Sequence, residues 1–181
     1  SIMVSAHERA LLRERDVKVC HCPFSNCGKG VPETPALLED GICVGLGTDG
    51  AAHGGLSLWN EMKIFRSVMN VKHGVAQSNP AIMLAAQIIS MATKEGYRLM
   101  KEEGGVIAEG KKADFITINT MQSHLYPTGN LVNTLLECVT ASDVCDMVVD
   151  GRLLMKNREI LTLDEEKIFY EAMKYMEELE A

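Results

Sequence analysis

The first part of the chain alternates between helix-like and strand-like hydrophobic patterns. Residues 5–15 carry apolar side chains among charges, and 56–74 do so over a longer stretch, so both predict helices. Residues 32–41 predict a helix with Pro in its first turn and Gly at its end. Between them, 17–20 predicts a short strand, and 42–47 is apolar at nearly every position, as in a strand covered on both faces. This order predicts parallel strands joined by helical crossovers.

The pattern changes near Gly104. Before it, residues 80–100 continue as one or two helices, whereas glycine-rich turns and a strand at 114–118 follow it. Residues 143–161 predict a hairpin around an Asp-Gly pair, and 164–180 predict an amphipathic helix. The chain therefore divides into an α/β part (1–103), a β-rich part (104–163) and a C-terminal helix (164–181).

The net charge and the cysteines of the chain bear on which partners it can bind and in which cell compartment it is expected. The net charge of −7 argues against nucleic acid or an anionic membrane surface, because both need a basic face. No apolar run approaches the ~20 residues that a membrane span requires. The start of the chain has no secretion-signal pattern, so the six cysteines are expected to be reduced thiols in a cytoplasmic protein.

Six motifs in order resemble the amidohydrolase superfamily. The resemblance is strongest to the branch of triazine chlorohydrolases, S-adenosylhomocysteine deaminases and guanine deaminases. It covers the chain from about residue 8 to the end. The motifs are HCPFSN (21–26), LLEDGICVGLGTDGAA (37–52), LWNEMK (58–63), MATKEGYRLM (91–100), GVIAEGKKADFITIN (105–119) and MVVDGRLLMKNREIL (147–161).

The resemblance implies an α/β fold, namely the C-terminal part of a (β/α)8 TIM barrel plus part of a small β-sandwich. Residues 17–20 and 42–47 then match the last two barrel strands, and 104–163 matches the returning part of the sandwich. It also implies a metal-dependent hydrolase that deaminates an amino-substituted nitrogen heterocycle such as a purine, pterin or triazine. The cofactor would be a divalent metal, zinc or iron.

Asp49 is the one candidate catalytic and metal-binding residue. It matches the family's aspartate at the end of the eighth barrel strand, which binds the metal and carries a proton. An ionised carboxylate suits both roles, because it can ligate zinc and can accept a proton from a metal-activated water. The flanking Gly47 and Gly50 allow a sharp turn and a close approach of substrate.

The other metal ligands of the family are missing from this sequence. It contains no His-x-His pair, and one carboxylate cannot hold a catalytic zinc, which takes about three protein ligands. We therefore expect an incomplete C-terminal part that is inactive alone and that binds no metal by itself. The alternative is a truncated, non-catalytic chain that acts as an oligomerisation or regulatory piece. Exposed strand edges would favour a homo-oligomer in either case.

Two histidines are candidate substrate-binding residues. His21 ends the first strand on the expected active face, where it either lines the substrate pocket or supports the His-Cys-Pro turn. His53 follows the Thr-Asp-Gly loop and either contacts substrate or faces solvent. Ser25 and Asn26 are expected to shape the loop after the first strand.

Overall fold

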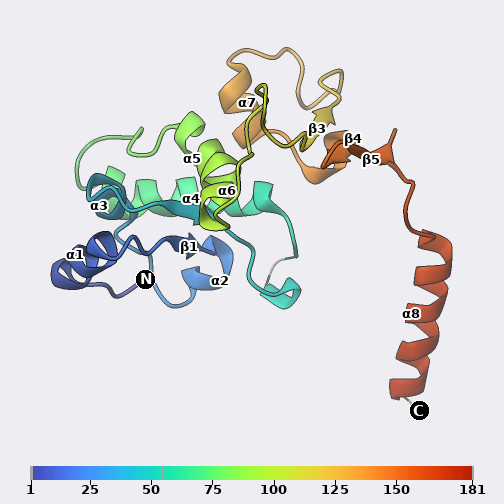
Figure 1. Cartoon of the computed structure of the whole chain (residues 1–181), viewed down its shortest axis with the longest axis horizontal. Helices are drawn as coiled ribbons and strands as arrows, with labels where there is room; N and C mark the ends of the chain where they lie inside the picture. Colours follow the sequence, from blue (N-terminus) through green and yellow to red (C-terminus); the bar gives the residue numbers. More distant parts are fainter. Residues whose placement is uncertain (1, 54, 181) are drawn as a thin grey trace.

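The computed structural model of the protein describes residues 2–53 and 55–180. A two-stranded parallel sheet lies at the centre of its first part (Figure 1). Strand β1 (Val19–His21) pairs with β2 (Val44–Leu46) so that His21 lies opposite Leu46. The predicted parallel pairing is therefore confirmed, with shorter strands than the hydrophobic pattern suggested.

Helices pack around this sheet and shield it from solvent. Helices α5 and α6 both contact β2, and α2 packs against α4. The helices of this part are α1 (Ala6–Glu14), α2 (Pro23–Cys27), α3 (Thr34–Glu39), α4 (Leu58–Met69), α5 (Ala85–Ala92) and α6 (Lys94–Leu99), with a 3-10 turn η1 (Ala51–His53) and a π-helical turn η2 (Asn70–Gly74).

Two helices differ from the sequence-based expectation. Residues 24–31 were expected to form a loop, but α2 begins at Pro23, whose fixed φ and missing N–H suit the first position of a helix. Helix α4 begins after Ser57, whose hydroxyl accepts a hydrogen bond from the Asn60 N–H, as expected of an N-cap. Its α-helical hydrogen bonding ends at Met69, and the chain continues as η2.

The hydrophobic core lies between the parallel sheet and helices α3, α4 and α5. Phe65, Ile88 and Leu136 are fully buried in it and come from three different helices. Each such side chain contributes about 2–3 kcal/mol of burial free energy, so these contacts fix α4 against the sheet. The core thereby determines where the loops at the ends of β1 and β2 can lie.

Helix α7 (Leu131–Glu137), which the sequence analysis did not predict, joins the second part of the chain to α4. The Trp59 indole N–H donates to the Leu135 carbonyl (3.0 Å). The Lys63 ammonium donates to the Val139 carbonyl at 2.9 Å. These bonds and the burial of Leu136 place residues 131–139 beside the first part, although they follow the change of composition near Gly104.

A four-stranded antiparallel sheet follows, in the order β3-β4-β5-β6. The predicted hairpin is confirmed, since Asp150 and Gly151 both have positive φ (49° and 73°), as the tight turn between β4 and β5 requires. Strands β3 and β6 extend this hairpin, one on each side. The strands are β3 (Phe115–Ile118), β4 (Val144–Val149), β5 (Arg152–Lys156) and β6 (Glu159–Ile160), with a 3-10 turn η3 (Ala141–Asp143) before β4.

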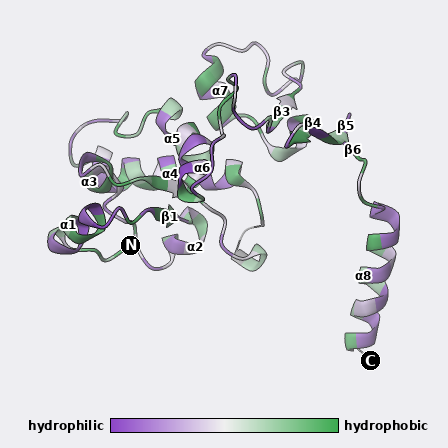
Figure 2. Cartoon of the chain, viewed as in Figure 1, coloured by the Kyte–Doolittle hydropathy of each residue, from purple (hydrophilic) through white to green (hydrophobic). Residues whose placement is uncertain are grey.

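Helix α8 (Glu165–Glu180) confirms the predicted C-terminal helix. It projects away from the rest of the molecule (Figure 1), and hydrophobic and hydrophilic positions alternate along it (Figure 2). Its apolar side chains are exposed, namely Ile168, Phe169, Met173, Met176 and Leu179. Within residues 2–53 and 55–180, no helix is both long enough and apolar enough to cross a membrane.

Candidate functional site

The loops that follow β1 and β2 lie side by side at one edge of the parallel sheet. The two strands run in the same direction, and the Gly47 N–H donates to the His21 carbonyl at 2.9 Å just where they end. The loop after β1 continues into α2, and the loop after β2 carries Asp49. This edge is where α/β folds place their functional loops, as the sequence analysis expected.

The Asp49 carboxylate is held by groups from both loops. Its Oδ2 accepts a 2.6 Å hydrogen bond from the Ser25 hydroxyl, and its Oδ1 accepts a 2.8 Å bond from the Gly50 N–H. Asp49 has a left-handed backbone (φ 57°), a conformation that aspartate tolerates better than most residues. Asp49 is exposed, whereas Ser25 is buried. A buried hydroxyl therefore orients a carboxylate that solvent can reach.

A buried carboxylate lies under α2 and holds the helix that carries Ser25. The Glu61 side chain is 2% exposed, and its Oε2 accepts a 2.8 Å hydrogen bond from the Phe24 N–H in the first turn of α2. Burial raises the pKa of Glu61, the negative charge of Asp49 raises it further, and the Phe24 N–H opposes both. Glu61 therefore links α4 to the loop that contacts Asp49.

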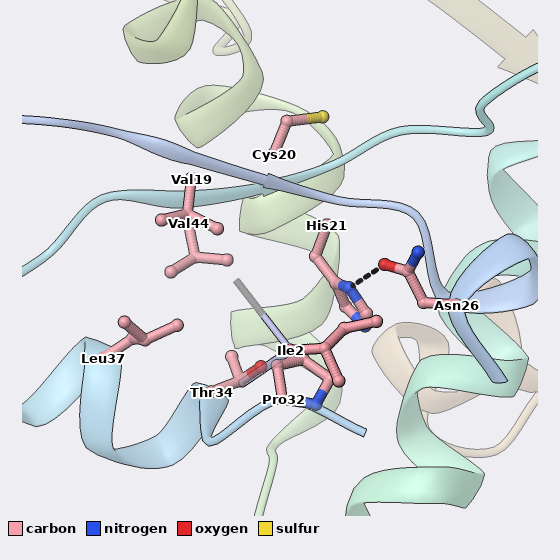
Figure 3. Close-up of a pocket in the computed structure, with 9 residues that line it drawn as sticks. All are labelled: Ile2, Val19, Cys20, His21, Asn26, Pro32, Thr34, Leu37 and Val44. Carbon is pink, nitrogen blue, oxygen red and sulfur yellow. Dashed lines mark hydrogen bonds between the residues drawn. The ribbon is translucent and has the colours of Figure 1, made fainter. Parts of the chain in front are cut away.

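His21 lies in the interior, beneath this edge. It is 5% exposed, and its Nδ1 lies 3.1 Å from Oδ1 of Asn26 (Figure 3). Its ring packs edge-to-face on Phe65 at 5.7 Å between centroids. Burial lowers the pKa of His21 to about 4, so the imidazole is neutral at pH 7. This geometry fits the alternative in which His21 supports the His-Cys-Pro turn. Contact of His21 with substrate stays a prediction.

The remaining candidates contribute less to the site. His53 ends η1, and its side chain lies outside the part of the structure that can be described. All six cysteines are free thiols. Asn26 bonds His21, and thus shapes the loop as expected, whereas its neighbour Ser25 bonds Asp49 directly.

The part of the chain that the structure describes presents no cluster of metal-binding side chains. Across residues 2–53 and 55–180, no three His, Cys, Asp or Glu side chains are grouped so that they could hold a metal ion. Asp49 presents one carboxylate, and a catalytic zinc takes three protein ligands and one open position.

The sequence analysis assigned no role to Glu61 and so missed its structural one. A signal was present, because Glu61, Phe65 and Met69 recur at a spacing of four and therefore share one face of α4. An acidic residue on an apolar face indicates a buried carboxylate with a specific partner. The partner itself, the Phe24 N–H, could not be read from that spacing.

The sequence matches the model of the amidohydrolase family over residues 1–158. It is 41% identical over 182 residues to a 5-methylthioadenosine/S-adenosylhomocysteine deaminase from Dictyoglomus thermophilum. It is 36% identical over 183 residues to a 5'-deoxyadenosine deaminase from Methanosarcina acetivorans. These alignments cover 98% and 99% of the chain but 42% and 41% of the relatives, so the chain spans about two fifths of their length.

Solved structures show the same fold in part of larger proteins. An adenosine deaminase from Xanthomonas campestris with bound zinc superposes with a TM-score of 0.90 at 23% identity, over 99% of this chain and 41% of that enzyme. A guanine deaminase from C. acetobutylicum with bound guanine gives a TM-score of 0.75 at 26% identity, over 84% of this chain and 37% of that one. The arrangement of β1, β2 and the surrounding helices is therefore that of a segment of such proteins.

Proposed function

The chain belongs to the amidohydrolase family, and from this premise we propose that it is the C-terminal part of a hydrolase that deaminates an amino-substituted nitrogen heterocycle. The two curated relatives described above are named as deaminases of adenosine derivatives, which favours a purine nucleoside over a pterin or a triazine. The observation that carries the proposal is Asp49, an accessible carboxylate held at the carboxyl edge of the parallel sheet by Ser25 and Gly50.

In this proposal β1 and β2 are the last two strands of a (β/α)8 barrel. Residues 1–103 supply that barrel segment, and 104–163 supply part of a β-sandwich. The preceding six strands and the remaining metal ligands belong to a part of the enzyme that this chain does not contain. A likeness to about two fifths of each relative, at a TM-score of 0.90 for the adenosine deaminase, supports this division.

Asp49 is proposed to be both a metal ligand and a proton carrier. A divalent metal, zinc or iron, would supply a water of lowered pKa in the complete enzyme. The chain's own contribution is to orient one carboxylate. The Ser25 hydroxyl fixes Oδ2, and the Gly50 N–H fixes Oδ1. Each carboxylate oxygen carries two lone pairs, so it can take part in more than one interaction at a time.

Replacing Asp49 in a protein that includes the missing part tests this role. Asp49→Asn should lower ammonia release from adenosine derivatives by about 100-fold or more and should reduce bound metal. Asp16→Asn is a matched control, since Asp16 is also exposed and left-handed (φ 48°) but precedes the amino end of β1. Turnover and metal content that are unchanged in Asp49→Asn would rule out the proposed role.

The isolated chain is proposed to be inactive, because its described residues supply no complete donor set for a metal. Its ammonia release should stay at the uncatalysed level whether or not zinc or iron is added. The same assay on a protein extended by the missing barrel units provides the comparison. Equal turnover by the two proteins would show that the proposal is wrong.

A second candidate function is a non-catalytic, self-associating chain. The exposed apolar residues of α8 favour it, because a stripe of this kind is buried when two helices pair. Phe169→Glu should then lower the molar mass measured by light scattering. Tyr170→Glu, which adds the same charge at the next position, about 100° around the helix from Phe169, should not. An unchanged mass in both variants would leave α8 without a part in association.

A further inference from the structure

A small cavity lies beneath the carboxyl end of β1, between the parallel sheet and the start of α3. Its volume is about 20 Å³, enough for one water molecule and too small for an organic ligand. Figure 3 shows the His21 ring pointing down from β1 toward Ile2 and Pro32, with Thr34 beside them. Apolar side chains form most of the remaining wall, among them Val19, Leu37 and Val44.

Two polar atoms of this wall have no hydrogen-bond partner among residues 2–53 and 55–180. They are Nε2 of His21 and Oγ1 of Thr34, and both are fully shielded from solvent. Leaving a buried donor or acceptor unsatisfied costs about 1–3 kcal/mol, and natural proteins rarely accept that cost twice in one place. Two orphaned atoms lining one cavity therefore indicate a ligand that satisfies both.

The hydrogen bond made by Nδ1 of His21 determines whether the ligand must donate to Nε2 or accept from it. Nδ1 of His21 faces the side-chain amide oxygen Oδ1 of Asn26 at 3.1 Å, and because this oxygen only accepts, Nδ1 carries the proton and donates it. Nε2 of the neutral ring is then an acceptor and needs a donor. The Thr34 hydroxyl does not fill this role, since it makes no hydrogen bond to the ring.

The cavity also limits the charge of the ligand. Of the residues that the structure describes, no Asp, Glu, Lys or Arg lines it, and burial keeps His21 neutral by lowering its pKa to about 4. An ion in this place would lose its hydration without gaining an opposite charge, which is costly. A neutral molecule that can both donate and accept fits, and the volume admits one of the size of water.

We propose that one internal water molecule binds here, donating a hydrogen bond to Nε2 of His21 and bonding the Thr34 hydroxyl. The water links the end of β1 to the first turn of α3. Through His21 and Asn26 it also supports α2, whose Ser25 contacts Asp49. The binding of this water does not depend on the proposed enzymatic activity, so the two can be tested separately.

A high-resolution crystal structure of the 181-residue chain tests the site directly. Electron density for one water within hydrogen-bond distance of both atoms is expected. An empty cavity, or a direct bond between the Thr34 hydroxyl and the His21 ring, would overturn the proposal. This measurement needs no substitution, so it decides even if a variant fails to fold.

Oxygen-17 relaxation dispersion, which counts long-lived internal waters, gives an independent measurement in solution. Thr34→Val should lose one such water relative to the wild type, because it keeps the shape of threonine without its hydroxyl. Thr34→Ser retains the hydroxyl and should lose none. Thr120→Val is the control, since Thr120 is exposed. The same count in Thr34→Val and the wild type would contradict the bridging role.

Discussion

The Ser25 hydroxyl donates a 2.6 Å hydrogen bond to Oδ2 of Asp49 and so joins the loops that follow two neighbouring strands. The two residues are 24 positions apart in the sequence. They meet because β1 and β2 are parallel and end at the same edge. A buried hydroxyl thereby holds an exposed carboxylate in one orientation.

Removing this hydroxyl should weaken the proposed catalysis without abolishing it. A hydrogen bond to a charged group contributes about 1.5–3 kcal/mol, so Ser25→Ala in a complete enzyme should lower kcat about 10- to 100-fold. KM should change less, because the hydroxyl contacts Asp49 and not the substrate. Ser142→Ala, at an exposed position in η3, should leave both constants unchanged. A normal kcat in Ser25→Ala would show that the bond does not matter for turnover.

Glu61 should behave as a structural acceptor whose charge is unfavourable. Its pKa is raised by burial and by Asp49, so the stability it contributes is present below the unfolded pKa of about 4.5 and is lost as pH rises through the folded value. At pH 7, Glu61→Gln should leave the free energy of unfolding unchanged or higher, since the amide oxygen still accepts from the Phe24 N–H. Glu61→Ala should cost about 2–4 kcal/mol in urea unfolding.

The pH dependence of these variants separates the charge of Glu61 from its shape. The advantage of Glu61→Gln over the wild type should grow as pH rises above 4.5 and should vanish below it. Glu109→Gln removes an exposed carboxylate and should follow the wild type throughout. A Glu61→Gln protein that loses stability as much as Glu61→Ala would contradict the assigned role.

His21 should make the fold sensitive to mild acid. Its pKa falls from 6.5 to about 4 on folding because burial disfavours the charged ring. The stability that depends on a neutral His21 is therefore complete above pH 6.5 and decreases as pH falls toward 4. The loss should reach about 3 kcal/mol, measured by urea unfolding across this range. An NMR titration in which the ring of folded His21 titrates near 6.5 would refute this expectation.

Gly151, in the turn between β4 and β5, and Gly129, just before α7, form a matched pair of glycines. Gly151 has φ 73°, and a Cβ there would meet no atom within 4 Å, so Gly151→Ala tests backbone strain alone. It should lower the free energy of unfolding by about 1–2 kcal/mol. A Cβ on Gly129 also has open space around it, without a positive φ, so Gly129→Ala should change stability by less than about 0.5 kcal/mol. Equal effects would show that the turn carries no strain.

Local sequence patterns were sufficient to predict an element where a few neighbouring residues determine the backbone conformation. Asp150-Gly151 predicted the hairpin because only such residues adopt two successive positive φ values readily. The apolar run 42–47 predicted β2, since a strand covered on both faces needs apolar residues at successive positions. The place of Asp49 just after that strand could likewise be read from the sequence, whereas its metal-binding role came from the family resemblance and stays a prediction.

Patterns were insufficient where structure depends on contacts between distant residues. Helix α2 has five residues, and its first turn is held by Glu61 from α4, which no local signal near Pro23 reveals. Helix α7 is stabilised by the burial of Leu136 against the first part of the chain. The Ser25 bond to Asp49 likewise requires knowing that the two strands pair.

The isolation of α8 has a consequence for how the chain melts. A helix of 16 residues is close to the shortest that persists alone in water, and its side chains are exposed rather than packed on the rest of the molecule. Its helix–coil equilibrium should therefore be gradual and independent of the cooperative transition of the core. Far-ultraviolet circular dichroism, which includes α8, should begin to change at lower temperature than the fluorescence of Trp59, the single tryptophan, which lies on α4. A single calorimetric enthalpy would then describe only the folded body and not the whole polypeptide.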